Sequence, residues 1–473
     1  MSARAARARS ALTGAGDRAL ALNAFAAAAG FYRAALGLWP QDATGQRAGL
    51  LFLLALALGG SGEDDDGAAL EQARSALLAV GDQAKAAETE ARLGELWWLK
   101  GHRDRASGHM GRAQALVRDE PASAAKAYVL SALARYQLLA DEFDARTAQQ
   151  ALELADELGL GEVQAQVLVT SGTARALAGD PQGKADIQRG LEIALAGNHL
   201  ATAVRGYANL SYVAQILDGD LPEGLRLGLE AEKVAQRLGA RATLRWTRGV
   251  LIGFWFELGN WDKCARAADE FLAESAALGP HYHDAFVRCC RSWMRLARGD
   301  MQAALEDQRE SLLSGRRAKD LQVLYPVLAF SAHVLAVAGR AGETRRILSE
   351  LFGADAVDLA YPYEGCTDCV LAAELVGRRD QARQWLAARR DFPWFVAARA
   401  LADQEFVAAA ESLDSMGAAR SAALARFRAA QELVKTGRSA EADDQLRHAL
   451  GFFRSVGATR FAREAQALLA ASA

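Results

Sequence analysis

The sequence predicts an all-α protein, a right-handed α-solenoid of antiparallel helix hairpins of about 40 residues each. Three observations predict this fold. A glycine followed by a polar residue recurs at a nearly constant spacing, the apolar residues between these glycines follow a helical period, and neither alternating β-branched runs nor Asn-Gly hairpin turns occur. Proline is also scarce, 8 in 473 residues, which is about 1.7% against roughly 5% in average proteins.

The recurring glycine divides each hairpin. From residue 101 to residue 339 successive marks lie 39 or 40 residues apart, with Ala140-Asp141 occupying one position that lacks glycine. The glycine marks are Gly101, Gly179, Gly219, Gly259, Gly299, Gly339, Gly377 and Gly437. A glycine ends a helix by taking the left-handed conformation, and the polar residue after it caps the next helix. Five places after most marks stands a small residue such as Ala106 or Ala304, although Lys184 is an exception. The small residue lets the two helices of a hairpin approach closely.

One hairpin cannot bury its own apolar face, so neighbouring hairpins must stack into a continuous row. We expect three segments: N-terminal hairpins over 1–58, a regular solenoid over 59–390 and irregular capping hairpins over 391–473. Pro393, within Asp391 to Trp394, is expected to interrupt a helix.

Three N-terminal features carry more local predictions. Residues 1–12 form a stub before a turn at Gly14–Gly16. The apolar run from Gly49 to Leu58 is too short to cross a bilayer, because ten helical residues span about 15 Å against roughly 30 Å. Residues 59–67, rich in glycine and aspartate, form an exposed turn whose acidic groups cap a helix that starts near Ala68.

Charge and cysteine usage narrow the class of protein. The net charge is −3 and the pI about 6.2, which does not suggest nucleic-acid binding. Five cysteines in a long chain argue against a disulfide framework. The N-terminus has no apolar signal region. We therefore expect a soluble, cytoplasmic protein with no membrane and no nucleic-acid partner.

The sequence contains no strong candidate for a catalytic or metal-binding motif. Lys184 follows Gly183, but the next residue is Ala185 and not the Ser or Thr that a phosphate-binding loop requires. Cys366 and Cys369 form a single Cys-x-x-Cys without the second ligand pair of a zinc site, and we interpret them as ordinary helical cysteines. The His281-Tyr282-His283 segment is interpreted as a helix start with a solvent-exposed ring. We expect no cofactor, no metal and no enzymatic activity.

The sequence resembles tetratricopeptide repeats (TPR). The resemblance rests on Gly94, Gly101, Ala106 and Ala113 and on an N-terminal set with the family's spacing, namely Ala28, Tyr32, Ala35, Leu36, Leu38 and Pro40. It implies a superhelix whose first helices line a concave groove for peptides or partner helices. The family's clamp for C-terminal carboxylates is expected to be absent, because its groove positions hold Leu130, Val169, Gly249 and Cys289, with only Asn209 fitting.

A narrower resemblance extends over most of the chain. Segments 19–40, 245–258 and 279–300 look like the C-terminal helical region of bacterial signalling proteins that combine a STAND-type ATPase with a class III adenylate or guanylate cyclase. Neither of these catalytic modules is present here. The resemblance implies that the chain is the repeat region, or a fragment, of a larger regulator.

The candidate binding residues follow from the resemblance. Counted back from the glycine marks, Asn209, Trp246, Trp293 and His333 fall on the groove face of successive hairpins, and exposed aromatics are frequent binding anchors. The competing interpretation places the tryptophans in the core. The predicted function is a non-catalytic scaffold that binds a protein or peptide partner, or a cyclase/ATPase module. The alternative is a ligand-sensing helical-repeat domain that binds a small molecule in its groove.

Overall fold

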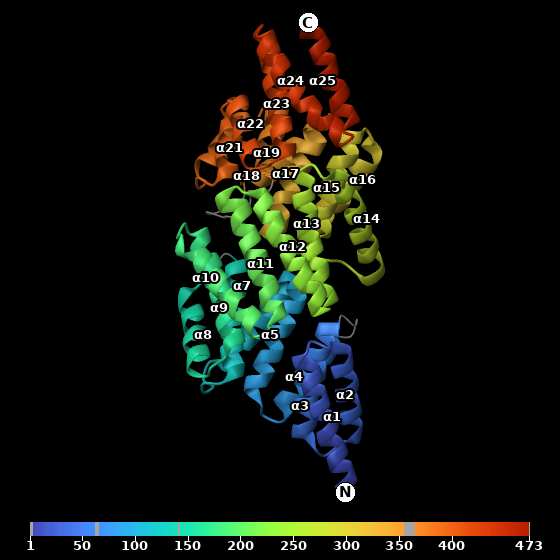
Figure 1. Ribbon diagram of the computed structural model, residues 1–473, viewed down its shortest axis with the longest axis vertical. Coiled ribbons are helices and arrows are strands. Elements are labelled where there is room, and N and C mark those ends of the chain that lie inside the picture. The colour runs from blue at the N-terminus through green and yellow to red at the C-terminus, as the bar shows by residue number, and fades with distance from the viewer. Residues whose placement is uncertain (1–2, 62–65, 141, 354–364, 473) are drawn as a thin grey trace. The chain divides into compact units, whose positions relative to one another are not determined.

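The computed structural model describes residues 3–61, 66–140, 142–353 and 365–472, and within these ranges the regular elements are helices without any strand. The chain divides into two compact units. Unit 1 comprises residues 1–210 and 229–247, and unit 2 comprises residues 211–228 and 248–473. The predicted all-α solenoid of stacked hairpins is confirmed (Figure 1).

The helices pair as antiparallel hairpins along the chain. The first five hairpins are α1 (Ala3–Ala21) with α2 (Phe25–Leu38), α3 (Thr44–Ser61) with α4 (Asp66–Ala79), α5 (Gln83–Leu99) with α6 (Arg103–Val117), α7 (Ala124–Leu139) with α8 (Ala145–Glu157), and α9 (Gly161–Leu177) with α10 (Gln182–Ala196). The next elements are α11 (Leu200–Val213) and the π-helical turn η1 (Ala214–Asp218), α12 (Leu221–Leu238), and α13 (Arg241–Glu257) with α14 (Trp261–Leu278).

Unit 2 continues with further hairpins. They are α15 (Asp284–Arg298) with α16 (Met301–Ala318), α17 (Leu321–Val337) with α18 (Ala341–Gly353), α19 (Cys366–Leu375) with α20 (Arg379–Ala387), α21 (Pro393–Ala402) with α22 (Phe406–Ser415), and α23 (Ala419–Lys435) with α24 (Ser439–Ser455), followed by α25 (Thr459–Ser472). The helices from α19 to α22 have only 9 or 10 residues, and those of the next hairpin, α23 and α24, have 17. The predicted break is confirmed, because α20 ends at Ala387 and Pro393 is the first residue of α21, where its missing N–H leaves no bond unmade.

The glycine marks adopt the conformation that their spacing predicts. All eight lie in the left-handed region, with φ between 64° and 94°. A second set of left-handed glycines ends the second helices and includes Gly81, Gly159, Gly239 and Gly279. The chain therefore turns about every 20 residues. Asp141, part of the one mark without glycine, lies outside the described residues.

Small residues bring the helices of each hairpin together, as predicted, and the structure also explains the exception. Ala106 and Ala304 are fully buried. In the hairpin of α9 and α10 the close contact falls on Gly183, one residue before Lys184. A Cβ at Gly183 would lie 2.3 Å from the Ala176 nitrogen, so only glycine fits.

Two N-terminal predictions are wrong. α1 runs without interruption through Gly14 and Gly16, and Gly16 serves helix packing, since a Cβ there would lie 2.5 Å from the Tyr32 ring. Likewise α3 continues through Gly60, which faces the Phe25 ring. In both cases glycine allows helices to approach closely instead of forming a turn. Of the predicted exposed turn, residues 62–65 lie outside the described residues.

The apolar run at 49–58 is part of α3, which packs against α2 and α4. Among the described helices, none is at once sufficiently long and apolar to span a lipid bilayer.

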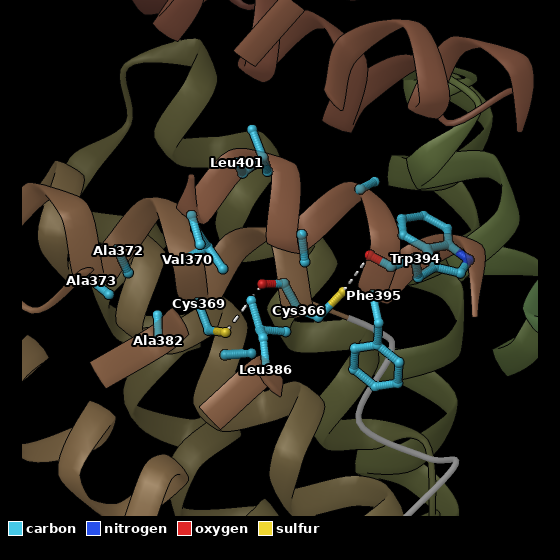
Figure 2. Packing of buried hydrophobic residues seen from close by; sticks show 14 of the residues in the cluster. Cys366, Cys369, Val370, Ala372, Ala373, Ala382, Leu386, Trp394, Phe395 and Leu401 are labelled. Atoms are coloured by element: carbon cyan, nitrogen blue, oxygen red, sulfur yellow. Dashed lines mark hydrogen bonds between the residues drawn. The ribbon is translucent and has the colours of Figure 1, made fainter. Parts of the chain in front are cut away.

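Short helices build a large part of the core of unit 2. α19, α20 and α21 contribute Cys366, Val370, Ala382, Leu386 and Trp394 to one apolar cluster (Figure 2). Within it Trp394 Nε1 donates a hydrogen bond to the Gln215 carbonyl at 3.0 Å. The core therefore joins the C-terminal hairpins to the beginning of unit 2.

Candidate functional site

The first helices of unit 1 form its inner layer. α5 contacts α7, and α7 contacts α9, whereas the second helices α6 and α8 have no comparable mutual contact among the described residues. Side chains of α11 also reach α9. The row of hairpins therefore curves toward α5, α7, α9 and α11. We call the polar side chains along these helices the inner face. Its partly exposed members are Arg92, Glu95, Tyr128, Arg135, Gln166, Arg205 and Asn209, and its buried members are Ser131, Thr170 and Thr173.

At one end of the inner face, one carboxylate joins α5 and α7. The Tyr128 hydroxyl donates to Glu95 Oε2 at 2.9 Å, and Arg135 Nη1 donates to Glu95 Oε1 at 3.3 Å. The Arg92 guanidinium lies 4.2 Å from the centre of the Tyr128 ring, a favourable cation–π distance. Burial raises the pKa of Tyr128 well above its usual value, so the phenol stays neutral. Glu95 and Arg135 keep 29% and 31% of their side-chain surface exposed.

Further along, neutral groups join α7, α9 and α11. Ser131 donates to Gln166 Oε1 at 3.3 Å. Arg205 Nη2 donates to the Gln166 carbonyl and to Thr170 Oγ1, both at 2.8 Å. Asn209 Nδ2 donates to Thr173 Oγ1 at 2.8 Å. These bonds fix the spacing of the helices and orient the half-buried Arg205 and Asn209.

Arg205 differs from the other inner-face arginines, Arg92 and Arg135, which both pair with carboxylates. Among the described residues it forms no ion pair, since both of its acceptors are neutral oxygens. Burial lowers the pKa of Arg205 to about 9, and repulsion from Arg135 contributes in the same direction. A cation in this setting is stabilised by an anion brought to it.

The structure places two of the predicted binding residues in unit 1 and two in unit 2. Asn209 is part of the inner face, and Trp246, on α13, is half-buried in unit 1. Trp293 and His333 are buried in unit 2, with 1% and 3% of their surface exposed. Their rings contact each other at a centroid distance of 5.8 Å.

Trp293 contacts the C-terminal helix α25, and His333 contacts Asp368, which is bound to Arg420 on α23. The Phe461 ring on α25 stacks on Trp293 at 5.2 Å. α25 is fixed there by Thr459, which donates to the Arg298 carbonyl at 2.9 Å, and by Arg460, which donates to the Val337 carbonyl at 3.0 Å. A partner would therefore reach Trp293 only after α25 had moved.

A buried ion cluster secures α23 in the same region. Arg420 donates to Asp368 Oδ1 at 3.0 Å and Oδ2 at 2.6 Å, and to Glu257 Oε2 at 2.8 Å. His333 Nδ1 lies 2.6 Å from Asp368 Oδ1. Burial would raise the pKa of Asp368, but Arg420 and His333 together hold it below its usual value. Each charge has a partner, as buried charges require.

Apart from Asn209, the inner-face residues are not among the binding residues that the sequence predicts. Val169, counted as a groove position, is fully buried. The side chains of α9 that bond toward α7 and α11 are Gln166, Thr170 and Thr173, of which both threonines are buried as well. A signal was available, because Arg135, Thr170 and Arg205 are polar residues at intervals of 35 in otherwise apolar helices.

The cysteines and histidines singled out in the sequence form no metal centre among the described residues. All five thiols are buried and reduced. Cys366 Sγ donates to the Trp394 carbonyl and Cys369 Sγ to the Cys366 carbonyl, so the pair packs in the core (Figure 2). Burial raises the pKa of the Cys369 thiol, which disfavours the thiolate that a metal needs.

The histidine segment at 281–283 also differs from its interpretation. The His281 ring is half-buried and packs edge-on against Phe271 at 5.2 Å, rather than being exposed to solvent. Asp284 caps the segment by accepting a hydrogen bond from the His281 N–H at 2.9 Å. Burial lowers the pKa of His283 to about 4, so this ring is neutral at physiological pH.

Unit 1 also contains a cleft of about 550 Å³ between α6, α7 and α8. Its lining mixes apolar and charged groups, among them Val117, Lys126, Leu130, Gln150 and Glu153. The volume lies within the range of small-molecule sites, about 300–1,000 Å³.

No protein-family model matches the sequence, and no curated protein does. Solved structures with a similar arrangement include a STAND ATPase with a tetratricopeptide repeat sensor from Pyrococcus horikoshii (13% identity, TM-score 0.42, 68% of this chain and 52% of that chain). A Rap protein complexed with competence and sporulation factor is similar at 9% identity (TM-score 0.46, 82% and 100%), and yeast Tom70 at 11% (TM-score 0.30, 97% and 96%). The chain thus spans about half the length of the STAND protein. What the described residues themselves show is an all-α row of stacked helix hairpins.

Proposed function

We propose that the protein is a non-catalytic scaffold that binds a protein or peptide partner along the inner face of unit 1. One contrast supports this proposal most directly. The inner face carries polar side chains that remain partly exposed, such as Glu95 and Arg135. In unit 2 the first-helix residues Trp293 and His333 are buried against the chain's own helices. Unit 1 therefore offers the surface that a partner can reach without rearranging the chain.

The proposed setting is bacterial signalling in the cytoplasm, with the chain acting as the repeat region of a larger cyclase/ATPase regulator. Its support is the sequence likeness of segments 19–40, 245–258 and 279–300 to the helical region of such regulators. Co-purification of the chain with a separately expressed cyclase or ATPase module encoded beside it tests this part of the proposal.

Site-specific photo-crosslinking tests the binding surface. The full chain would carry p-benzoylphenylalanine at position 209 on the inner face or, as the control, at position 149 on the exposed surface of α8. Each protein would be irradiated with an array of fluorescein-labelled decapeptides of acidic, neutral and basic composition. Peptides should crosslink at position 209 and not at position 149. Equal labelling at both positions, or none at 209, would contradict the proposal.

A second candidate function is small-molecule sensing, and the cleft between α6, α7 and α8 favours it. Thermal-shift screening with sugars and nucleotides tests it. A melting temperature that rises with ligand, and a rise abolished by Leu130→Trp in the cleft, would support sensing. Constant melting temperatures across the screen would remove its support.

A further inference from the structure

The inner face holds more hydrogen-bond donors than the protein uses. Among the described residues, Arg205 donates only from Nη2, to two neutral oxygens. Its Nε and Nη1 have no acceptor there, and neither atom is sealed from solvent. A guanidinium presents its five N–H groups in a planar fork that matches a carboxylate. Arg205 therefore keeps one edge of that fork available.

Arg205 bonds to no carboxylate among the described residues, although Glu95 and Glu162 act on it from a distance. Glu95 already accepts from both Tyr128 and Arg135. Glu162, on α9, lies 3.7 Å from His199 Nδ1 and is half-exposed. Arg135 and Arg205 lie near enough to repel each other, and the inner-face carboxylate between α5 and α7, Glu95, already accepts two hydrogen bonds. Within the described ranges, Arg205 is thus left without a carboxylate that bonds to it directly.

We propose that Arg135 and Arg205 together receive the side-chain carboxylate of an aspartate or glutamate in an extended segment of a partner protein. This inference rests on the function proposed above and names the chemistry of the partner. A carboxylate is planar, and its two oxygens match the planar fork of the guanidinium edge that Arg205 leaves unused. Two charge-assisted hydrogen bonds in fork geometry would also fix its orientation.

Neighbouring amides suit the backbone of such a segment. The Asn209 amide donates to Thr173, and its Oδ1 accepts no hydrogen bond from the described residues. Gln166 Oε1 accepts from Ser131, and its Nε2 donates to none of the described residues. One free acceptor and one free donor thus flank Arg205 and can pair with a peptide N–H and C=O. A free organic acid would leave both amides unused.

Fluorescence anisotropy with defined peptides tests the inference. The tightest acidic decapeptide of the array would be titrated with the full chain and with Arg135→Gln and Arg205→Gln, whose folding is checked by circular dichroism. Arg189→Gln is the matched control, because Arg189 lies on the second helix α10 and its side chain is 63% exposed. Peptide versions with each Glu replaced by Gln, or by phosphoserine, complete the set.

We expect the acidic peptide to lose about tenfold or more in affinity with either Arg135→Gln or Arg205→Gln, as for a charge-assisted bond. Arg189→Gln should change it less than twofold. Replacing the critical Glu by Gln should weaken binding to the natural chain but not further to Arg205→Gln.

Several results would overturn the inference. These are acidic peptides that fail to bind, acidic peptides that bind equally to both arginine variants, and a phosphoserine peptide that binds tenfold more tightly than its Glu counterpart. Neutral or basic peptides that crosslink at position 209 would leave the proposed function standing while refuting the carboxylate. Absence of crosslinking by every peptide class would refute both.

Discussion

Removing the guanidinium of Arg420 should destabilise unit 2 strongly. Arg420 and Asp368 expose only 2% and 1% of their side chains, and the Glu257 side chain exposes 9%. Arg420→Met keeps much of the volume, which borders the Phe256 and Trp293 rings, but leaves two buried carboxylates without their cation. Breaking a buried ion pair in this way costs about 3–5 kcal/mol.

The matched control lies on the same helix. Lys435 is 65% exposed and, within the described ranges, pairs only with Glu432, so Lys435→Met should change the free energy of unfolding by less than about 0.5 kcal/mol. The two units need not unfold together, so a single melting curve does not isolate the effect. Hydrogen exchange measured by mass spectrometry does, because peptides from α19 and α23 report on unit 2 and peptides from α7 and α9 on unit 1.

The effect of Arg420→Met should depend on pH with a definite sign. In the natural chain the pKa of Asp368 is depressed, so its stabilising contribution is complete above the unfolded value, about 3.9, and is lost as the pH falls through the depressed value. Without Arg420, burial favours the neutral form of the Asp368 carboxyl and raises its pKa, so stability is lost as the pH rises. The loss should therefore be larger at pH 8 than at pH 5. A loss as small as that of Lys435→Met, or one that grows toward low pH, would refute the reasoning.

Three other predictions follow from the packing. Gly183→Ala should lower the free energy of unfolding of unit 1 by about 1–3 kcal/mol or more through overpacking. The control is Gly111→Ala, where a Cβ meets nothing within 4 Å; in denaturant unfolding it should be neutral or stabilising. Equal effects of the two substitutions would contradict the close helix contact at Gly183. Phe461→Ala removes the ring stacked on Trp293, so it should lower the free energy of unfolding by about 3–5 kcal/mol and speed proteolysis of α25. Phe31→Ala, at a 37% exposed position, should do neither. An unchanged cleavage rate in Phe461→Ala would count against the packing of α25. The five thiols are buried, and burial raises the pKa of Cys264, Cys289, Cys366 and Cys369. They should therefore resist Ellman's reagent at pH 8 until denaturant is added, and rapid labelling of the native chain would contradict their burial.

The turns were predictable from sequence because their cause is local. A residue such as Gly101 or Gly299 must take a left-handed conformation whatever packs around it. The same reasoning failed at Gly16 and Gly60, where glycine instead makes room for an aromatic ring of a neighbouring helix. Only the distant partner, Tyr32 or Phe25, distinguishes these two roles.

The candidate site was less predictable because it depends on contacts between distant segments. Trp293 is buried by Phe461, which lies far away in the sequence on a helix that folds back onto α15. Similarly, Asp368 and Glu257 appear as ordinary surface acids until α23 brings Arg420 between them. Helical periodicity indicates that a side chain shares a face with others, but not what covers that face.

A crystal structure of the chain with its tightest-binding decapeptide tests the central claim most directly. The account predicts a peptide lying along α7, α9 and α11, with a carboxylate within hydrogen-bond distance of Arg205 and a backbone group bonded to Asn209. A peptide seated on the second helices α6, α8 and α10, or against α23 to α25 in unit 2, would contradict it.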